Sequence, residues 1–162
     1  MNERQVLAGA KTHFELFSLP VRFALDRQIL ELRYLQLTQA THPDLAGPDE
    51  QVEAMELSAR VNEAYATLRD DLKRAEYILC IRSAEREEPS PATLARVFEM
   101  REALSAALDA HDDETAWRLR DQASQWLGET IAQIAAKLDT GAGEQNAGGL
   151  VSTARYIQKI IA

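Results

Sequence analysis

Three consecutive residues, His42, Pro43 and Asp44, have the side chains best suited to specific polar contacts. Imidazole can donate and accept hydrogen bonds, and an aspartate carboxylate accepts them from a partner's arginine. Pro43 restricts the backbone, so both polar side chains should point outward in a set geometry. A rigid, exposed loop loses little conformational entropy on binding. The tripeptide therefore favours a role in docking to a partner protein. The same residues could instead form a simple turn, in which Pro43 ends a helix and Asp44 caps the turn.

Signatures of catalysis and of metal binding are missing from the sequence. It has no glycine-rich phosphate loop, no Gly-x-Ser-x-Gly elbow and no His-Glu-x-x-His pair. His13, His42 and His111 lie far apart and lack the spacing of metal ligands. We therefore expect no enzymatic activity, no metal and no cofactor. A metalloenzyme using His42 and Asp44 is the least favoured rival.

Charge and cysteine content narrow the class of partner. The net charge is −8 at pH 7, and acidic residues outnumber basic ones in both halves, so nucleic acid and membranes are not expected partners. Cys80 is the only cysteine and stands in the apolar run 77–81, where we expect it to be buried. No signal peptide and no apolar run of membrane-spanning length are evident, which predicts a cytoplasmic protein.

The hydrophobic pattern predicts an all-α chain. The apolar residues Leu25, Ile29, Leu32, Leu35 and Leu37, with polar residues between them, fit a helix over about 26–41. Asp26 is its expected N-cap, and Ser90 followed by Pro91 marks another helix start. Residues 1–11 should be a loose terminus, and 140–149 a flexible, glycine-rich loop. The expected helices are 13–19, 26–41, 50–69, 71–81, 91–110, one from Asp112 or Asp113 to about Leu138, and 150–161.

Three segments together resemble a J-domain. Residues 13–20 (HFELFSLP) are similar to its short opening helix, and 32–44, which end in His42-Pro43-Asp44, to its second helix and loop. Residues 61–68 (VNEAYATL) are similar to its third helix. The resemblance implies a J-domain, a module that docks on an ATP-driven chaperone.

The remainder of the chain resembles the HscB-type co-chaperones of iron–sulfur cluster assembly. The similar segments are 74–79 (RAEYIL) and 98–104 (FEMREAL), and there is no Gly/Phe-rich linker or zinc-binding cysteine region of the DnaJ type. The resemblance implies a J-domain with a short following helix over 1–82, a linker over 83–91 and a C-terminal three-helix bundle over 92–162. It also implies two partners: an HscA- or DnaK-type chaperone, whose ATPase is stimulated, and the iron–sulfur scaffold protein IscU.

Site residues follow from the same resemblance. The chaperone-binding residues would be His42, Pro43, Asp44, Arg27 and Arg33. The scaffold-binding residues would be Leu94, Phe98, Glu99, Glu102 and Tyr156, on a face where Ala95 and Ala106 are smaller or less charged than the family pattern.

Several alternatives stay open at this point. Leu94 and Phe98 could equally belong to the bundle core, and Glu99 and Glu102 could be ordinary solvated charges. At the level of the whole protein, the alternatives are a J-domain adaptor for a different client and a purely structural helical protein.

Overall fold

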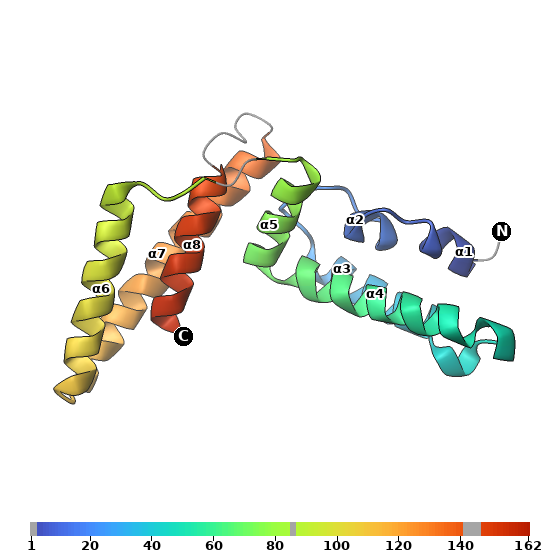
Figure 1. The fold of residues 1–162 in the computed structure, drawn as a ribbon, viewed down its shortest axis with the longest axis horizontal. Helices are drawn as coiled ribbons and strands as arrows, with labels where there is room; N and C mark the ends of the chain where they lie inside the picture. Colours follow the sequence, from blue (N-terminus) through green and yellow to red (C-terminus); the bar gives the residue numbers. More distant parts are fainter. Residues whose placement is uncertain (1–2, 85–86, 141–146) are drawn as a thin grey trace. The chain divides into compact units, whose positions relative to one another are not determined.

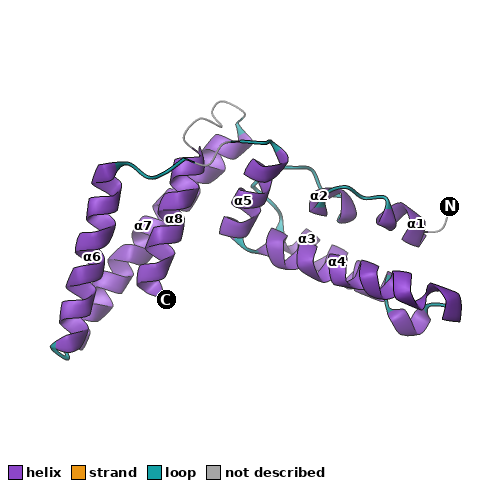
Figure 2. Cartoon of the chain, viewed as in Figure 1, coloured by secondary structure: helices purple, strands orange, loops and turns teal. Residues whose placement is uncertain are grey.

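The computed structural model describes residues 3–84, 87–140 and 147–162, and every regular element within these ranges is helical (Figures 1 and 2). The chain forms two compact units, Met1–Arg74 and Ala75–Ala162. The predicted all-α class is therefore confirmed. None of the described helices is long and apolar enough to cross a membrane.

The first unit is built around two long antiparallel helices, α3 and α4. Asp26 caps the first of them, accepting a hydrogen bond from the backbone N–H of Gln28 at 2.8 Å, as predicted. The elements of this unit are α1 (Glu3–Ala8), α2 (His13–Leu16), α3 (Arg27–Ala40), the 3₁₀ turns η1 (Pro43–Leu45) and η2 (Pro48–Glu50), α4 (Gln51–Arg69) and the start of α5 (Asp71–Ile81).

The core-facing side of α3 agrees with the predicted apolar positions at Leu37 only. Leu30 and Leu37 are buried, whereas Ile29, Leu32 and Leu35 are 47%, 56% and 63% exposed. Leu30 and Leu37 are two turns apart and so lie on one side of the helix. The apolar residues of α3 form two rows, and only the row through Leu30 and Leu37 faces the core.

The start of the chain is more ordered than predicted. Residues 3–8 form α1, and Leu7 is buried. The Arg60 guanidinium donates to the backbone carbonyls of Ala8 at 3.1 Å and Ala10 at 2.7 Å. The expectation of a loose segment over 1–11 is therefore wrong for the described part, and residues 1–2 lie outside it. Arg60 on α4 fixes this segment through these two hydrogen bonds. No local pattern in residues 1–11 predicts that contact.

The boundary between the units falls inside α5, earlier than the predicted linker 83–91. Arg74, in the first unit, is buried and donates to the carbonyl oxygens of Phe23 at 2.8 Å and Leu68 at 2.6 Å. Arg82, in the second unit, donates to the Leu138 carbonyl at 3.1 Å. The rest of α5 thus packs with the second unit. Of the predicted linker, residues 85–86 lie outside the described part.

The second unit contains three long helices besides the end of α5. Ser90 caps the first of them by accepting from Thr93 N–H at 3.2 Å, with Pro91 at its first position, as predicted. Asp112 caps the next by accepting from Thr115 N–H at 3.0 Å, and this bond holds the pKa of the Asp112 carboxyl below its usual value. The helices are α6 (Pro91–Asp109), α7 (Asp113–Asp139) and α8 (Ala147–Ile161), and their core includes Val97, Leu104, Ala107, Ala116, Ala123, Ile157 and Ile160.

Two further expectations for this unit are wrong. Helix α8 begins at Ala147 instead of near 150, so Gly148 and Gly149 are helical, and only 141–146 of the predicted loop lie outside the described part. A Cβ on Gly149 would lie 3.6 Å from the Glu88 carbonyl oxygen, which is an ordinary van der Waals contact, so the approach of the 87–88 backbone does not itself require glycine. Cys80, expected to be buried, is exposed, because α5 turns Ile78 and Leu79 inward and leaves the next residue outside.

Candidate functional site

The tripeptide His42-Pro43-Asp44 forms a tight, exposed turn directly after α3. Thr41, the C-cap of α3, is completely buried, and its hydroxyl donates to the Leu37 carbonyl at 2.8 Å. Pro43 begins η1, where a residue without an N–H is well suited. The turn is closed by backbone hydrogen bonds from Leu45 N–H to His42 O at 3.1 Å and from Ala46 N–H to Pro43 O at 3.0 Å. The turn therefore rests on a buried, fully bonded base.

Within this turn the histidine, and not the aspartate, is the capping side chain. His42 Nδ1 accepts a hydrogen bond from the backbone N–H of Asp44 at 3.2 Å. An accepting Nδ1 carries no proton, so in this arrangement the ring N–H is at Nε2. The Asp44 carboxylate lies 3.9 Å from Nδ1, and the side chains of His42 and Asp44 are 54% and 88% exposed. The predicted outward geometry is thus present, while the alternative in which Asp44 caps the turn is not.

The pairing of α3 with α4 below the turn is fixed by a cluster of polar and aromatic side chains. The rings of Tyr34 and Tyr65 stack with centroids 3.9 Å apart and planes 14° apart. The Tyr34 hydroxyl donates to Asn62 Oδ1 at 2.9 Å, and the Tyr65 hydroxyl donates to the Glu31 carboxylate. The bond to Glu31 is the main cause that raises the pKa of Tyr65 above its ordinary value. These contacts hold together the two helices that present the turn.

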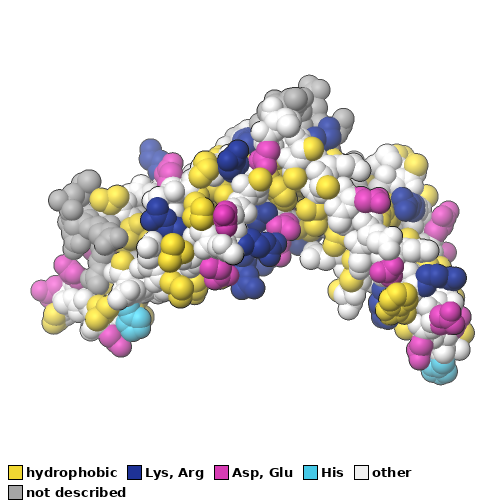
Figure 3. Space-filling model, turned by 180° about the vertical axis from the view of Figure 1, so that it is seen from behind, with side chains coloured by type: hydrophobic (Ala, Val, Ile, Leu, Met, Phe, Trp, Pro, Cys, Tyr) yellow, Lys and Arg dark blue, Asp and Glu magenta, His cyan; other side chains and the backbone are white. Residues whose placement is uncertain are grey.

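Arg27 and Arg33, the other predicted chaperone-binding residues, are both exposed on α3. Arg27 is paired with Asp71 at 3.2 Å, and Arg33 donates to Gln36 Oε1 at 3.4 Å. The positive charge of Arg27 is therefore partly compensated by Asp71, and Arg33 contacts a neutral side chain. Figure 3 shows acidic and basic side chains interspersed on the displayed face, with hydrophobic side chains open to solvent between them. Long-range electrostatic steering by such a surface is weak.

The predicted scaffold-binding residues lie on α6 and α8. Phe98 is 55% exposed, Glu99 and Glu102 are exposed, and Leu94 is half-buried. The alternative that Phe98 belongs to the bundle core is therefore wrong. Tyr156 lies on α8, which packs directly against α6. The Tyr156 side chain is partly buried and packs against the core cluster of the bundle. One side of α6 thus presents an exposed aromatic residue beside two carboxylates.

No group of three or more His, Cys, Asp or Glu side chains within the described ranges is arranged to hold a metal ion. His42 and Asp44 have no further ligand of that kind beside them. The arrangement can accept and donate hydrogen bonds at an exposed turn, which suits recognition.

Two paired helices present an exposed His-Pro-Asp turn above a buried threonine, and a helical bundle follows them in the chain. This combination defines the class of J-domain co-chaperones with a C-terminal bundle. Chaperone HscB from Vibrio cholerae superposes with a TM-score of 0.82, at 29% identity and over 93% of each chain. Human co-chaperone HscB superposes with a TM-score of 0.84 over 94% of this chain and 79% of the other; at 22% identity this likeness supports the fold alone.

Sequence comparisons give the particular family. Residues 89–162 match the family model described as the HSCB C-terminal oligomerisation domain. The co-chaperone protein HscB homolog of Burkholderia mallei (strain SAVP1) is 34% identical over 159 residues, covering 93% of this chain and 90% of the relative. The homolog of Paraburkholderia phytofirmans is 36% identical over 161 residues, covering 92% and 89%. The chain belongs to the HscB co-chaperone family.

Proposed function

We propose that this protein stimulates the ATPase of an HscA- or DnaK-type chaperone and delivers an IscU-type iron–sulfur scaffold to it. Membership of the HscB family supports a co-chaperone role in iron–sulfur cluster assembly. The observation that carries the finer proposal is the exposed, internally bonded turn at His42, Pro43 and Asp44.

The turn acts on the chaperone by binding, and the hydrolytic chemistry belongs to the chaperone. The Asp44 carboxylate can accept from a guanidinium of the nucleotide-binding domain because its side chain is 88% exposed. The bond from its backbone N–H to His42 fixes the position of the residue. His42 offers its Nε2–H outward, and Pro43 keeps the two groups in register. Because the turn is already ordered, binding energy goes into shifting the chaperone toward its hydrolysis-competent state. Arg27 and Arg33 add contacts along α3.

The α6 side of the second unit holds the scaffold. Phe98 provides an exposed aromatic anchor of the kind that dominates protein interfaces, and Glu99 and Glu102 provide flanking charges. Leu94 and Tyr156 extend this surface on α6 and α8. A scaffold held on the same chain as the chaperone-binding turn meets the chaperone at a high effective concentration. This tethering makes client transfer effectively intramolecular.

The test is single-turnover ATP hydrolysis by the chaperone, with this protein added, in the presence and absence of purified scaffold. Stimulation that rises further with scaffold is the expected result. His42→Gln removes the Nδ1 contact to Asp44 N–H and the outward Nε2–H, and should abolish stimulation while the circular dichroism spectrum stays unchanged. If stimulation of the ATPase does not change when scaffold is added, the protein is instead a J-domain adaptor for another client. Wild-type behaviour of His42→Gln would reduce the tripeptide to a turn.

A further inference from the structure

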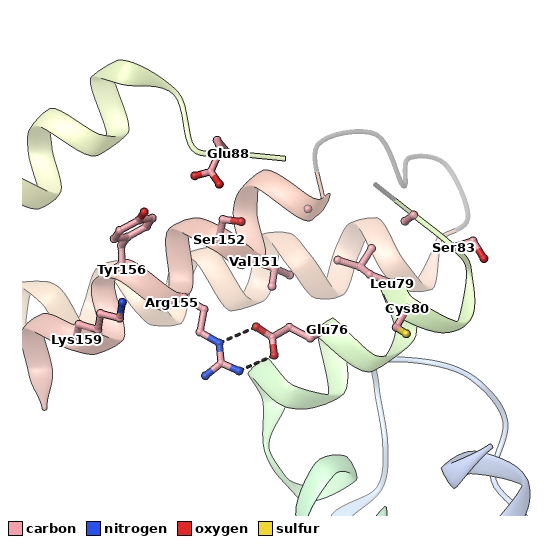
Figure 4. A pocket seen from close by; sticks show the side chains of 12 residues that line it. Glu76, Leu79, Cys80, Ser83, Glu88, Val151, Ser152, Arg155, Tyr156 and Lys159 are labelled. Carbon is pink, nitrogen blue, oxygen red and sulfur yellow. Dashed lines mark hydrogen bonds and ion pairs between the residues drawn. The ribbon is translucent and has the colours of Figure 1, made fainter. Parts of the chain in front are cut away.

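A groove in the second unit lies between α5 and α8 and is distinct from the α6 residues assigned above. Its volume is about 820 Å³, within the range of ligand-binding clefts. Figure 4 shows its side chains, which come from both helices and from the segment after α5. We call this site the α5–α8 groove; its principal residues are Glu76, Leu79, Cys80, Val151, Arg155 and Tyr156.

We infer that the α5–α8 groove continues the scaffold-binding face and receives an extended segment of the same client. The inference rests on the proposed function and adds to it a second contact region. Tyr156 supplies the continuity, because this residue is both a predicted scaffold-binding residue and part of the groove wall. A client seated on α6 and Tyr156 would therefore already contact one wall of the groove.

The length of the groove fits a peptide better than a compact small molecule. Its α8 wall runs from Gly148 to Lys159. At 1.5 Å rise per residue, this wall is roughly 16 Å long. An extended chain advances about 3.3 Å per residue, so the groove accommodates roughly five residues.

The chemistry of the walls indicates what the segment carries. Leu79 and Val151 are largely buried, and their edges form an apolar floor for one hydrophobic side chain of the client. The Arg155 guanidinium, whose Nε donates to Glu76 Oε1 at 2.6 Å, forms a paired bridge across the groove and adds little net charge. Lys159 is exposed, with its ammonium 5.5 Å from the centre of the Tyr156 ring. We therefore expect a client carboxylate near Lys159.

The only cysteine of the chain gives a direct test, because Cys80 is exposed and lines the groove. Alkylation of Cys80 by N-ethylmaleimide in the full-length protein can be followed by intact mass, which separates this chain from the scaffold's own thiols. Saturating scaffold should slow alkylation about tenfold. The matched control is the double variant Cys80→Ser, Ser124→Cys, whose thiol is on α7 outside the groove and should react at the same rate with and without scaffold.

A second measurement asks whether the groove contributes to affinity. A bulky maleimide adduct on Cys80 should weaken scaffold binding about tenfold, and Lys159→Gln should weaken it about threefold. Neither change should alter ATPase stimulation without scaffold. Unprotected Cys80 together with intact scaffold binding would overturn the groove inference and leave the proposed function standing. Failure of the wild type to bind scaffold at all would overturn both.

Discussion

The two units present their candidate sites in different ways. In the first unit, the site is a turn of three consecutive residues whose geometry is set by local backbone bonds and by the buried Thr41 beneath it. In the second unit, the site is spread over α6 and α8, and its residues come together only through helix packing. A turn site is therefore sensitive to one functional group, whereas a helix-face site distributes its binding energy over several side chains.

The two units also differ in how each uses a central arginine. The Arg74 side chain is 6% exposed and holds two carbonyl oxygens as well as Asp71 Oδ1 at 2.6 Å. The Arg155 side chain is 40% exposed, and its guanidinium donates to the Glu76 carboxylate. A buried, fully bonded guanidinium is costly to remove, whereas a partly exposed ion pair contributes little. Removal of Arg74 should therefore destabilise the first unit more than removal of Arg155 destabilises the second.

The largest effect is expected for Arg74→Ala. Removing this guanidinium leaves the carbonyls of Phe23 and Leu68 without their donor and removes the cation from the Phe23 ring, whose centroid is 4.6 Å away. We expect the free energy of unfolding of the first unit to fall by about 3–5 kcal/mol. Both tryptophans, Trp117 and Trp126, are in the second unit. Urea unfolding should thus shift by circular dichroism but not by tryptophan fluorescence.

Arg155→Ala is the control for that experiment. Its pair with Glu76 is partly exposed, so the loss should be no more than about 1 kcal/mol and should be seen by tryptophan fluorescence. Equal losses for the two variants would remove the distinction between a buried and an exposed arginine.

The next effect in size is the loss of ATPase stimulation in Asp44→Asn. The substitution keeps the shape of the side chain and removes the negative charge, which takes away a charge-assisted hydrogen bond of about 1.5–3 kcal/mol. Half-maximal stimulation should therefore need about ten to a hundred times more protein. The Asp44 side chain is 88% exposed, so thermal stability should not change.

Asp49→Asn is the matched control for Asp44→Asn. Asp49 lies in η2, is exposed, and loses the same charge close to the same turn. Normal stimulation by Asp49→Asn shows that position, and not net charge, decides the effect. A similar loss in both variants would contradict the assignment of Asp44.

A smaller effect is expected for Phe98→Ala on scaffold affinity. The Phe98 residue is more than half exposed and serves as one anchor among several on this surface. Its truncation should reduce the binding free energy by about 1–2 kcal/mol, which calorimetry would measure as a dissociation constant about five- to thirtyfold larger. Trp117→Ala removes a ring that is 69% exposed on α7, outside the proposed face, and should bind scaffold normally. If only Trp117→Ala weakened binding, the face would have to be reassigned.

Local rules account for the parts of the fold that the sequence predicts well. Asp26, Ser90 and Asp112 cap their helices because capping depends on the side chain and the next three residues. The turn at His42 follows from Pro43 in the same way. These features need no knowledge of distant residues, so a single sequence is sufficient to predict them.

The missed features all depend on contacts between distant residues. Two apolar rows on α3 fit helical spacing, and only the packing of α4 selects Leu30 over Ile29. The buried role of Arg74 depends on the Phe23 carbonyl, and the order of α1 depends on Arg60. The exposure of Cys80 depends on which side of α5 faces the bundle. The position of Phe98 is ambiguous from the sequence for the same reason, because periodicity alone does not distinguish an exposed face from a buried one.

The smallest predicted effect is a pH dependence that belongs to the first unit. Burial lowers the pKa of His13 below 6.5, with Glu63 opposing the shift and Arg60 adding to it. The folded state therefore favours neutral His13, and the unfolded chain binds the proton more readily. The stability of this unit should be unaffected by His13 well above pH 6.5 and should decrease as the pH falls through 6.5 toward the lower folded pKa. In urea unfolding followed by circular dichroism between pH 7.5 and about 5, His13→Gln should show a shallower acid-side loss of stability than the wild type. Identical pH profiles for His13→Gln and wild type would assign the acid-side loss to other groups.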